Sequence, residues 1–278
     1  MNRLIAELQR LYLPPVLRGQ VLAPDTAALA PAAGALTAAE LAQGLAGAAT
    51  VLLDLAGPDG MTRSLVLSFA RRGDWPHVAA LYQALQDDLE LPAPAIAVAA
   101  DNGYQIWLSL AEPVALPLAR QFLAALVGKY LNDLPANSIA GVPAATAGPV
   151  ALVPSLNSAN GKWSAFIDPS MGSMFAEESG LDMAPNLDRQ ADMLAGLACM
   201  APGQLQVTLD LLLASPEQPA PISPPPSETT ARLSLAGTFS DPQSFLLALM
   251  NDPAASPDQR IEAAKALLPY FAKQAPSR

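Results

Sequence analysis

A proline-rich stretch near residue 220 constrains the organisation of this chain more than any other feature. Six of the thirteen residues 215–227 are proline, and Pro224, Pro225 and Pro226 are consecutive. Consecutive prolines cannot join a helix or a central strand, because they lack the backbone N–H and fix φ. The other residues are mostly Ser, Glu, Gln and Ala, which have little to bury. We therefore predict a domain over residues 1–214, a linker over 215–229 and a tail over 230–278.

Length and charge bound the class of protein. The chain has 278 residues, enough for one large domain with an appendage, and 51% of them are hydrophobic. Fifteen basic residues face twenty-five acidic ones, so the net charge is −10. An acidic field repels phosphate backbones, although it also simply favours solubility. Any nucleic-acid site must therefore be a local basic patch, for which Arg71, Arg72, Arg120 and Lys129 are the candidates.

Cysteine and histidine usage excludes several kinds of site. Cys199 is the only cysteine, so no intramolecular disulfide or multi-cysteine metal site can form, and we expect it to be a small buried apolar residue. His77 is the only histidine, which excludes a two-histidine metal site. Charges interrupt the apolar residues of segment 2–12, and no 18 apolar residues run together. We therefore expect no membrane contact and a cytoplasmic location.

The pattern of apolar residues predicts a mixed α/β (α+β) fold with a mainly antiparallel sheet flanked by helices. Turn signals predict one hairpin from strands 50–55 and 64–69, and another from strands 95–99 and 104–110. Two more strands are expected around the polar loop 157–161, and residues 204–213 alternate like a strand. Helices are expected over residues 2–12, 38–45, 74–92, 117–131 and 186–200.

The tail carries signals for two helices. Asp241 followed by Pro242 begins one helix that extends to about Asn251, and a capping box at Ser256 begins the other. Such a tethered amphipathic pair is suited to docking, so we expect a protein partner to bind through residues 241–273. The tail also resembles a short helical segment of phage-associated and DNA-packaging proteins.

Four carboxylates lie next to predicted strand ends: Asp54, Asp59, Asp101 and Asp168. Metal-dependent nucleotidyl transfer places carboxylates at such positions. Aspartate is equally a preferred turn residue, because its side chain bonds to nearby backbone groups. Both interpretations remain open. Glycine-rich phosphate loops and Gly-x-Ser-x-Gly nucleophile elbows are absent from the sequence.

The order of these pieces over residues 48–200 resembles the catalytic core of archaeo-eukaryotic primase-type (PrimPol-type) proteins. The resemblance lies in a strand ending in Asp54, the hairpin Asp101-Asn102-Gly103-Tyr104-Gln105, and a later strand ending in Asp168. In that family the first strand carries an Asp-x-Asp metal pair, the hairpin carries a histidine that contacts nucleotide phosphate, and the later strand carries a third aspartate.

The resemblance implies a degenerate active site. Asp54 matches the first metal carboxylate and Asp168 the third, but Ala56 stands at the second and Gln105 at the histidine. One or two carboxylates cannot replace the ligands of a two-metal site, so the catalytic positions are predicted to be lost. The resemblance leaves as binding candidates Asn102, Gly103, Tyr104 and Gln105 of the hairpin, together with Arg71 and Arg72.

Three functions follow as hypotheses. The first is a non-catalytic primase-like module that retains binding of a nucleotide or single-stranded nucleic acid, in a replication or mobile-element setting. The second is an interaction or scaffold module acting through the C-terminal helices. The third is a metal-dependent nucleotidyltransferase using Asp54, Asp59 and Asp168, and this reading alone would require Mg²⁺ or Mn²⁺.

Overall fold

The structure is a computed structural model that describes residues 1–22, 34–143, 148–214, 241–251, 260–261 and 263–267. The chain divides into two compact units, Met1–Pro216 and Glu217–Arg278, and each is described by itself. The proposed linker over 215–229 lies outside the described residues. The domain boundaries of the sequence analysis therefore stay predictions.

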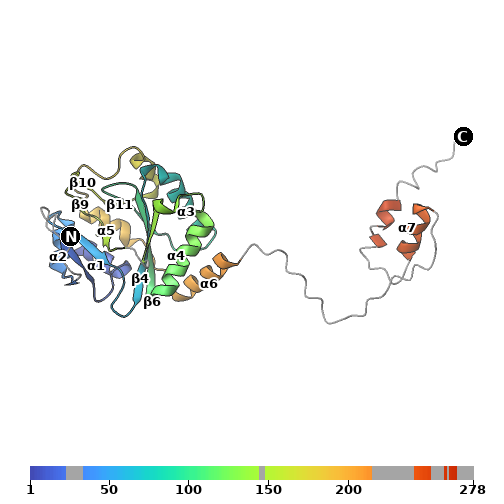
Figure 1. The fold of residues 1–278 in the computed structure, drawn as a ribbon, viewed down its shortest axis with the longest axis horizontal. Coiled ribbons are helices and arrows are strands. Elements are labelled where there is room, and N and C mark those ends of the chain that lie inside the picture. The colour runs from blue at the N-terminus through green and yellow to red at the C-terminus, as the bar shows by residue number, and fades with distance from the viewer. Residues whose placement is uncertain (23–33, 144–147, 215–240, 252–259, 262, 268–278) are drawn as a thin grey trace. The chain divides into compact units, whose positions relative to one another are not determined.

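The first unit contains a five-stranded antiparallel sheet in the order β11-β5-β6-β4-β7 (Figure 1). Its strands are β4 (Met61–Phe69), β5 (Ala95–Val98), β6 (Tyr104–Ala115), β7 (Ile139–Val142) and β11 (Ala165–Ile167). The predicted hairpin of β5 and β6 is confirmed, with Val98 opposite Tyr104 on either side of the Asp101–Gly103 turn. We call these five strands the large sheet.

A second, small sheet has the order β2-β1-β3-β8. It contains β1 (Arg18–Leu22), β2 (Gly34–Ala35), β3 (Thr50–Asp54) and β8 (Val150–Ala151), and every pairing is antiparallel. A separate two-stranded hairpin joins β9 (Leu156–Asn157) to β10 (Lys162–Trp163). Strand β1 lies in a stretch for which the sequence analysis predicted no element.

Helices cover the large sheet on both faces, as the period-two pattern of its strands requires. Leu65 and Leu67 of β4 face one core, which is filled by α3 (Trp75–Asp87), α4 (Leu116–Tyr130) and α6 (Pro202–Leu213). Val66 and Trp107 face the opposite core, shared with α1 (Asn2–Leu11), α2 (Ala38–Leu45), α5 (Leu187–Ala195) and β3 of the small sheet. The mixed α/β class with antiparallel sheets flanked by helices is therefore confirmed.

The remaining described elements of this unit are short 3₁₀ helices. They are η1 (Arg72–Asp74), η2 (Ala136–Ser138) and η3 (Pro169–Phe175). The predicted capping box of α2 is confirmed, because the Thr37 hydroxyl accepts from the Glu40 N–H while the Glu40 carboxylate accepts from the Thr37 N–H. No helix among the described residues is long and apolar enough to cross a membrane.

The predicted hairpin of residues 50–55 and 64–69 is wrong, because β3 and β4 belong to different sheets. Strand β3 pairs with β1 and β8, whereas β4 pairs with β6 and β7. An isolated antiparallel bridge between Ala56 and Thr62 closes the turn that connects the two strands. A turn signal identifies a reversal of the chain, but the partner of each strand is chosen by burial against distant residues.

The predicted strand over residues 204–213 is also wrong, because these residues form α6. Leu205, Thr208 and Leu209 are its buried residues, at the i, i+3, i+4 spacing of a helix. Pro202 occupies the first turn, and the Gln204 side chain accepts from the Ala201 N–H. A proline in the first turn and a capping glutamine are the sequence signals for a helix here, and they outweigh the short alternation of apolar and polar residues.

The two strands expected around the 157–161 loop are present as β8 and β11, which lie in different sheets, and the loop itself joins β9 to β10. Two further expectations need correction. The helix expected over 186–200 ends at Ala195, and Met200 makes a parallel bridge to Leu110. Cys199 is half-buried rather than buried.

In the second unit, α7 (Pro242–Asn251) is confirmed with Asp241 at its start, where the Asp241 carboxylate accepts from the Ser244 N–H at 2.8 Å. Residues 260–261 and 263–267 are also helical, within the second predicted tail helix. The Ser256 capping box of that helix lies outside the described residues.

Candidate functional site: a groove between the two sheets

Two pockets lie where the large and small sheets face each other, and a third adjoins one of them at the end of the large sheet. The Gln105 pocket, of about 320 Å³, and the turn pocket, of about 280 Å³, share Ala99, Asp101 and Gln105. The Asp54 pocket, of about 190 Å³, and the Gln105 pocket are each lined by one residue of the same face of β3, Asp54 and Thr50 respectively, and they have no lining residue in common. We call the three pockets together the groove.

Strand periodicity explains which side chains line the groove. Val51 and Leu53 of β3 are buried in the core, so the alternate residues Thr50 and Asp54 face away from it toward the pockets. On β6, Gln105 lies two residues before buried Trp107 and therefore shares its face. Ala140 and Val142 of β7 line the turn pocket and the Asp54 pocket, respectively.

Gln105 lies at the junction of two pockets. Its Oε1 accepts from the indole Nε1 of Trp107 at 3.0 Å, which fixes the orientation of the side-chain amide. Because an amide has separate donor and acceptor groups, its Nε2 can then serve as a donor in the groove. The surrounding residues of the Gln105 pocket are mostly small or uncharged: Thr50, Ala99, Ala100, Asp101, Ala151, Val153, Ser155, Leu156, Asn157 and Ser164.

The turn between β5 and β6 packs tightly on the end of β4. Gly103 has φ of 77°, and a Cβ there would lie 1.9 Å from the Phe69 carbonyl oxygen. Its N–H donates to Ser179 Oγ at 2.9 Å.

Tyr104 is buried, with 0% of its surface exposed, and its hydroxyl donates to the Gly172 carbonyl at 2.9 Å. Burial raises the pKa of Tyr104 to about 12. Of these hairpin candidates, Asn102 and Gln105 thus retain polar side-chain groups at the turn pocket.

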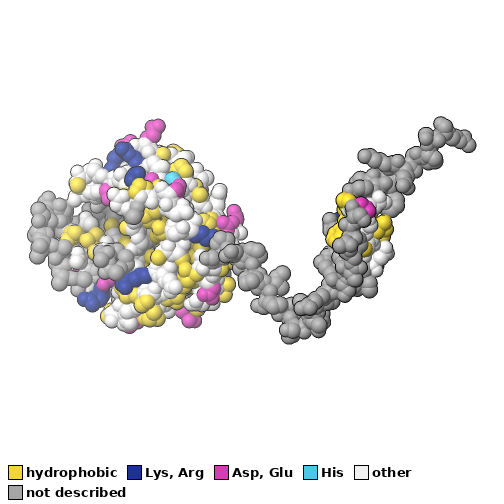
Figure 2. All heavy atoms as spheres, turned by 45° about the vertical axis from the view of Figure 1, so that its right-hand side comes forward, with side chains coloured by type: hydrophobic (Ala, Val, Ile, Leu, Met, Phe, Trp, Pro, Cys, Tyr) yellow, Lys and Arg dark blue, Asp and Glu magenta, His cyan; other side chains and the backbone are white. Residues whose placement is uncertain are grey.

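Arg71 and Arg72 follow the end of β4, and the Arg71 N lies beside Gly103. The structure therefore brings this pair to the predicted hairpin turn, although neither arginine lines a pocket of the groove. The Arg72 guanidinium donates to the Glu177 carbonyl. Both arginines are exposed, and Lys and Arg occupy separate spots on the face seen in Figure 2.

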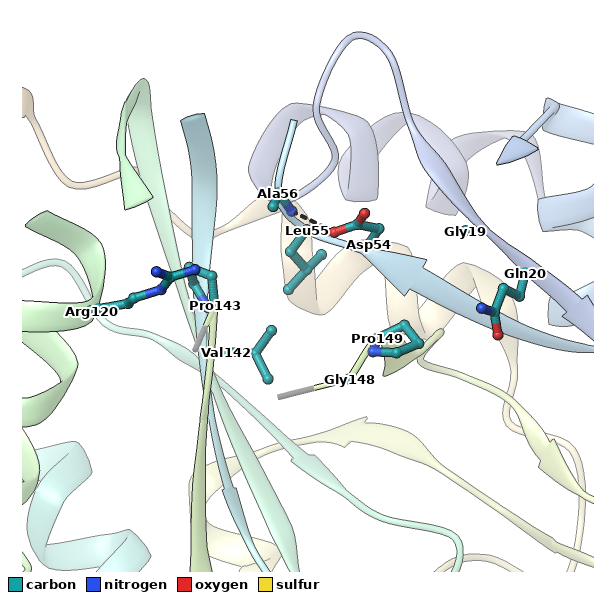
Figure 3. Close-up of a pocket in the computed structure, with 10 residues that line it drawn as sticks. All are labelled: Gly19, Gln20, Asp54, Leu55, Ala56, Arg120, Val142, Pro143, Gly148 and Pro149. Carbon is teal, nitrogen blue, oxygen red and sulfur yellow. Dashed lines mark hydrogen bonds between the residues drawn. The ribbon is translucent and has the colours of Figure 1, made fainter. Parts of the chain in front are cut away.

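The two candidate metal carboxylates lie beside opposite edge strands of the large sheet, although Asp54 itself ends β3 of the small sheet. Asp54 is grouped with Val142 of edge strand β7, and its Oδ1 accepts from the Ala56 N–H at 3.1 Å (Figure 3). Asp168 follows edge strand β11 and lines a different pocket, with Pro94 and Met193. The two edge strands are four inter-strand spacings apart, roughly 19 Å at about 4.8 Å per spacing, so the structure does not bring the two carboxylates together.

Each predicted carboxylate has a local backbone partner. Asp59 Oδ1 accepts from the Met61 N–H at 3.1 Å, and Asp101 Oδ1 accepts from the Asn102 N–H at 2.8 Å. Asp168 Oδ1 accepts hydrogen bonds from both the hydroxyl and the N–H of Ser170. These hydrogen bonds, that of the hydroxyl first, lower the pKa of the Asp168 carboxyl. Within the described part of the chain, no three His, Cys, Asp or Glu residues are grouped so that they could hold a metal ion.

Arg120 is the basic residue of the Asp54 pocket, and sequence reasoning placed it only in a diffuse patch. It extends from α4 toward Pro143, on the other side of the pocket from Asp54 (Figure 3). Lys129, the other α4 candidate, lies over the ring of Tyr130 and lines none of the three pockets. Which of the two α4 residues reaches a pocket depends on how the helix lies against the edge of the sheet, and the sequence does not specify that placement.

Fold and site together define a mixed α/β protein with a polar groove between two antiparallel sheets. No family model matches the chain, and no curated protein matches it. Among solved structures, the chain is similar to the AEP domain of the primase-polymerase of cyanophage S-2L, with 10% sequence identity and a TM-score of 0.39. The match covers 69% of this chain and 97% of that chain.

Proposed function

We propose that this chain is a binding module whose groove takes a nucleotide or a short single strand, and that it does not transfer nucleotidyl groups. The observation that carries the proposal is the position of Gln105, whose oriented amide lies at the junction of two pockets. Proteins bind small ligands in concave pockets of several hundred Å³ that carry a few precisely placed polar groups. The groove has such a volume and such polar groups.

The charges of the groove support binding more than catalysis. Its charged lining residues are Asp54, Asp101 and Arg120, and the two carboxylates lie in different pockets. A two-metal site requires several convergent anionic ligands to hold dications about 3.5–4 Å apart. The described residues offer no such convergence. A replication or mobile-element setting is part of the proposal and rests on the resemblance of the motif order.

Fluorescence anisotropy of labelled nucleoside triphosphate, a labelled single strand and a primer–template tests the proposal, at low and moderate salt and with or without Mn²⁺. The informative variant is Gln105→Glu, which keeps an acceptor for Trp107 but adds a negative charge in the groove. Gln43→Glu adds the same charge on the exposed face of α2 and is the matched control.

We expect the wild type and Gln43→Glu to bind at least one probe, and Gln105→Glu to bind it at least about tenfold more weakly, as expected for like-charge repulsion in a site. Absence of binding to every probe at low salt, where electrostatic attraction is strongest, would overturn the proposal. If the wild type extends primers and Asp54→Ala does not, the result would instead support the hypothesis of a metal-dependent nucleotidyltransferase.

A second candidate is an interaction module acting through residues 241–273. In the second unit, Phe245 and Ile261 are 40% and 52% exposed, although they are large apolar residues. Exposed apolar side chains on short helices are typical of docking segments. Deletion of residues 228–278 would abolish a specific pull-down if the tail recruits the partner, whereas a partner retained by the truncated chain would contradict this candidate.

A further inference from the structure

Strand β7 is an edge of the large sheet, and its outer backbone groups are unpaired. The Ala70 N–H donates to the Ser138 carbonyl at 2.8 Å, which fixes the alternation of hydrogen bonds between β4 and β7. In an antiparallel ladder every second residue turns its N–H and C=O to the neighbouring strand, so Ala140 bonds to β4. Ile139 and Gly141 turn theirs outward, where no described residue forms a hydrogen bond with them.

This edge lacks the features that usually prevent an edge strand from pairing with another chain. Such features are charged side chains, bulges and groups that cover the edge. The register of β7 on β4 has no shift, and no residue from Leu134 to Gly161 is charged. On the opposite edge, the Gln190 amide bonds to both the N–H and the C=O of Phe166. Strand β7 is therefore the open edge of the large sheet.

The residues of β7 are complementary to a second copy of the same strand. Two antiparallel copies related by a two-fold axis at Ala140 place Ile139 of each opposite Gly141 of the other. These residues then exchange N–H···O bonds, so the outward groups of both are satisfied. The large Ile139 side chain meets a glycine. The two Ala140 residues form the closely spaced pair, about 4.5 Å between Cα atoms, which suits a small side chain.

Charge favours the same arrangement. The chain has a net charge of −10, so two copies approach most easily at an uncharged surface. Arg120 lies beside Pro143 at one end of β7, and Asp101 shares the turn pocket with Ile139 at the other end. Antiparallel pairing brings the Arg120 end of each copy to the Asp101 end of the other, whereas parallel pairing would bring like charges together.

We infer that two copies of this chain form a dimer in which their β7 strands pair antiparallel about Ala140 and join the two large sheets. Ala140 and Val142 line the turn pocket and the Asp54 pocket, so each copy borders the groove of the other. The inference concerns a surface beside the groove and does not depend on what the groove binds.

Sedimentation equilibrium of the full chain tests it, at concentrations up to about 1 mM because an interface between two short strands is small and weak. The variants are Ala140→Lys and Ala140→Glu, each of which places like charges opposite each other at the axis. Ala140 is exposed, so both charges are tolerated in the monomer. Ala39→Lys adds a charge on the exposed face of α2 and is the control.

We expect the wild type and Ala39→Lys to dimerise with the same Kd, and each Ala140 variant alone to dimerise at least about tenfold more weakly, because like charges directly opposite repel. An equimolar mixture of Ala140→Lys and Ala140→Glu should recover the association, which unfolded variants could not do. A wild type that stays monomeric, Ala140 variants that dimerise as it does, or a mixture as weak as its components would overturn the inference.

Disulfide formation checks the register. Cys199 is the only cysteine, so Cys199→Ala provides the background. Ala140→Cys should cross-link two copies under mild oxidation, because Cα atoms about 4.5 Å apart can be bridged. Val142→Cys should not, because its two copies lie about 13 Å apart along the paired strands. Cross-linking through Val142→Cys but not through Ala140→Cys would contradict an axis at Ala140.

Discussion

The side-chain amide of Gln190 forms hydrogen bonds with both backbone polar groups of Phe166. The Phe166 N–H donates to Gln190 Oε1 at 2.8 Å, and Gln190 Nε2 donates to the Phe166 carbonyl at 2.9 Å. Phe166 is the central residue of β11, an edge strand of the large sheet, and Gln190 comes from α5 and is 5% exposed. One glutamine thus replaces a neighbouring strand and protects the edge from pairing with another chain.

Substitution Gln190→Leu should lower the free energy of unfolding by about 2–4 kcal/mol, because it leaves a buried N–H and a buried C=O unpaired. Urea denaturation followed by circular dichroism measures the change. Gln43→Leu, on the exposed face of α2, should change stability by no more than about 0.5 kcal/mol. Equal effects of the two substitutions would contradict the role of the Gln190 amide.

Gly103 should be intolerant of a side chain. Gly103→Ala combines a left-handed φ of 77° with a Cβ placed 1.9 Å from the Phe69 carbonyl oxygen. We expect a loss of about 2–5 kcal/mol, from backbone strain and overpacking together. Gly161 has φ of 72° with no atom within 4 Å of an added Cβ, so Gly161→Ala should lose only about 1 kcal/mol. Chemical denaturation of both variants separates the clash from the strain.

The stability contributed by Asp168 should depend on pH. Hydrogen bonds from Ser170 lower the pKa of the Asp168 carboxyl below its ordinary value of 3.8. A carboxyl with a lowered folded-state pKa stabilises the fold above the unfolded-state pKa, and this contribution is lost as the pH falls through the folded-state pKa. The stability difference between wild type and Asp168→Asn should therefore be present at pH 7 and vanish under strong acid.

Carboxyl NMR titration provides the direct check on Asp168. In Ser170→Ala the pKa of Asp168 should return toward 3.8, because the substitution removes the Ser170 hydroxyl, whose hydrogen bond is the largest cause of the shift. A titration curve of Asp168 that is the same in the wild type and in Ser170→Ala would contradict the assignment.

Binding of Mn²⁺ should not depend on Asp54. Asp54 is the one carboxylate among the described residues that line its pocket, and an asparagine at this position can still accept from the Ala56 N–H. Water-proton relaxation during Mn²⁺ titration should therefore give the same result for the wild type, Asp54→Asn and the control Asp101→Asn. A site lost only in Asp54→Asn would revive the metal-dependent reading.

Local signals in the sequence determined several elements correctly. The Thr37–Glu40 capping box begins α2, Asp241 with Pro242 begins α7, and the Asp101–Gly103 turn joins β5 to β6. In each case the interacting groups lie within a few residues of one another, so their geometry follows from backbone dihedrals and short side chains alone. The mixed α/β class followed from the two periodicities of apolar residues.

The tertiary structure alone decided which strands are neighbours and which side chains share the groove. Sequence paired residues 50–55 with 64–69, but β3 found its partners in β1 and β8. It grouped Asp54 with Asp168, which lie beside opposite edge strands of the large sheet, and it gave no role to Gln190. Strand partners and pocket walls are set by burial of apolar faces between segments far apart in the chain, and that long-range choice leaves no local pattern in the sequence.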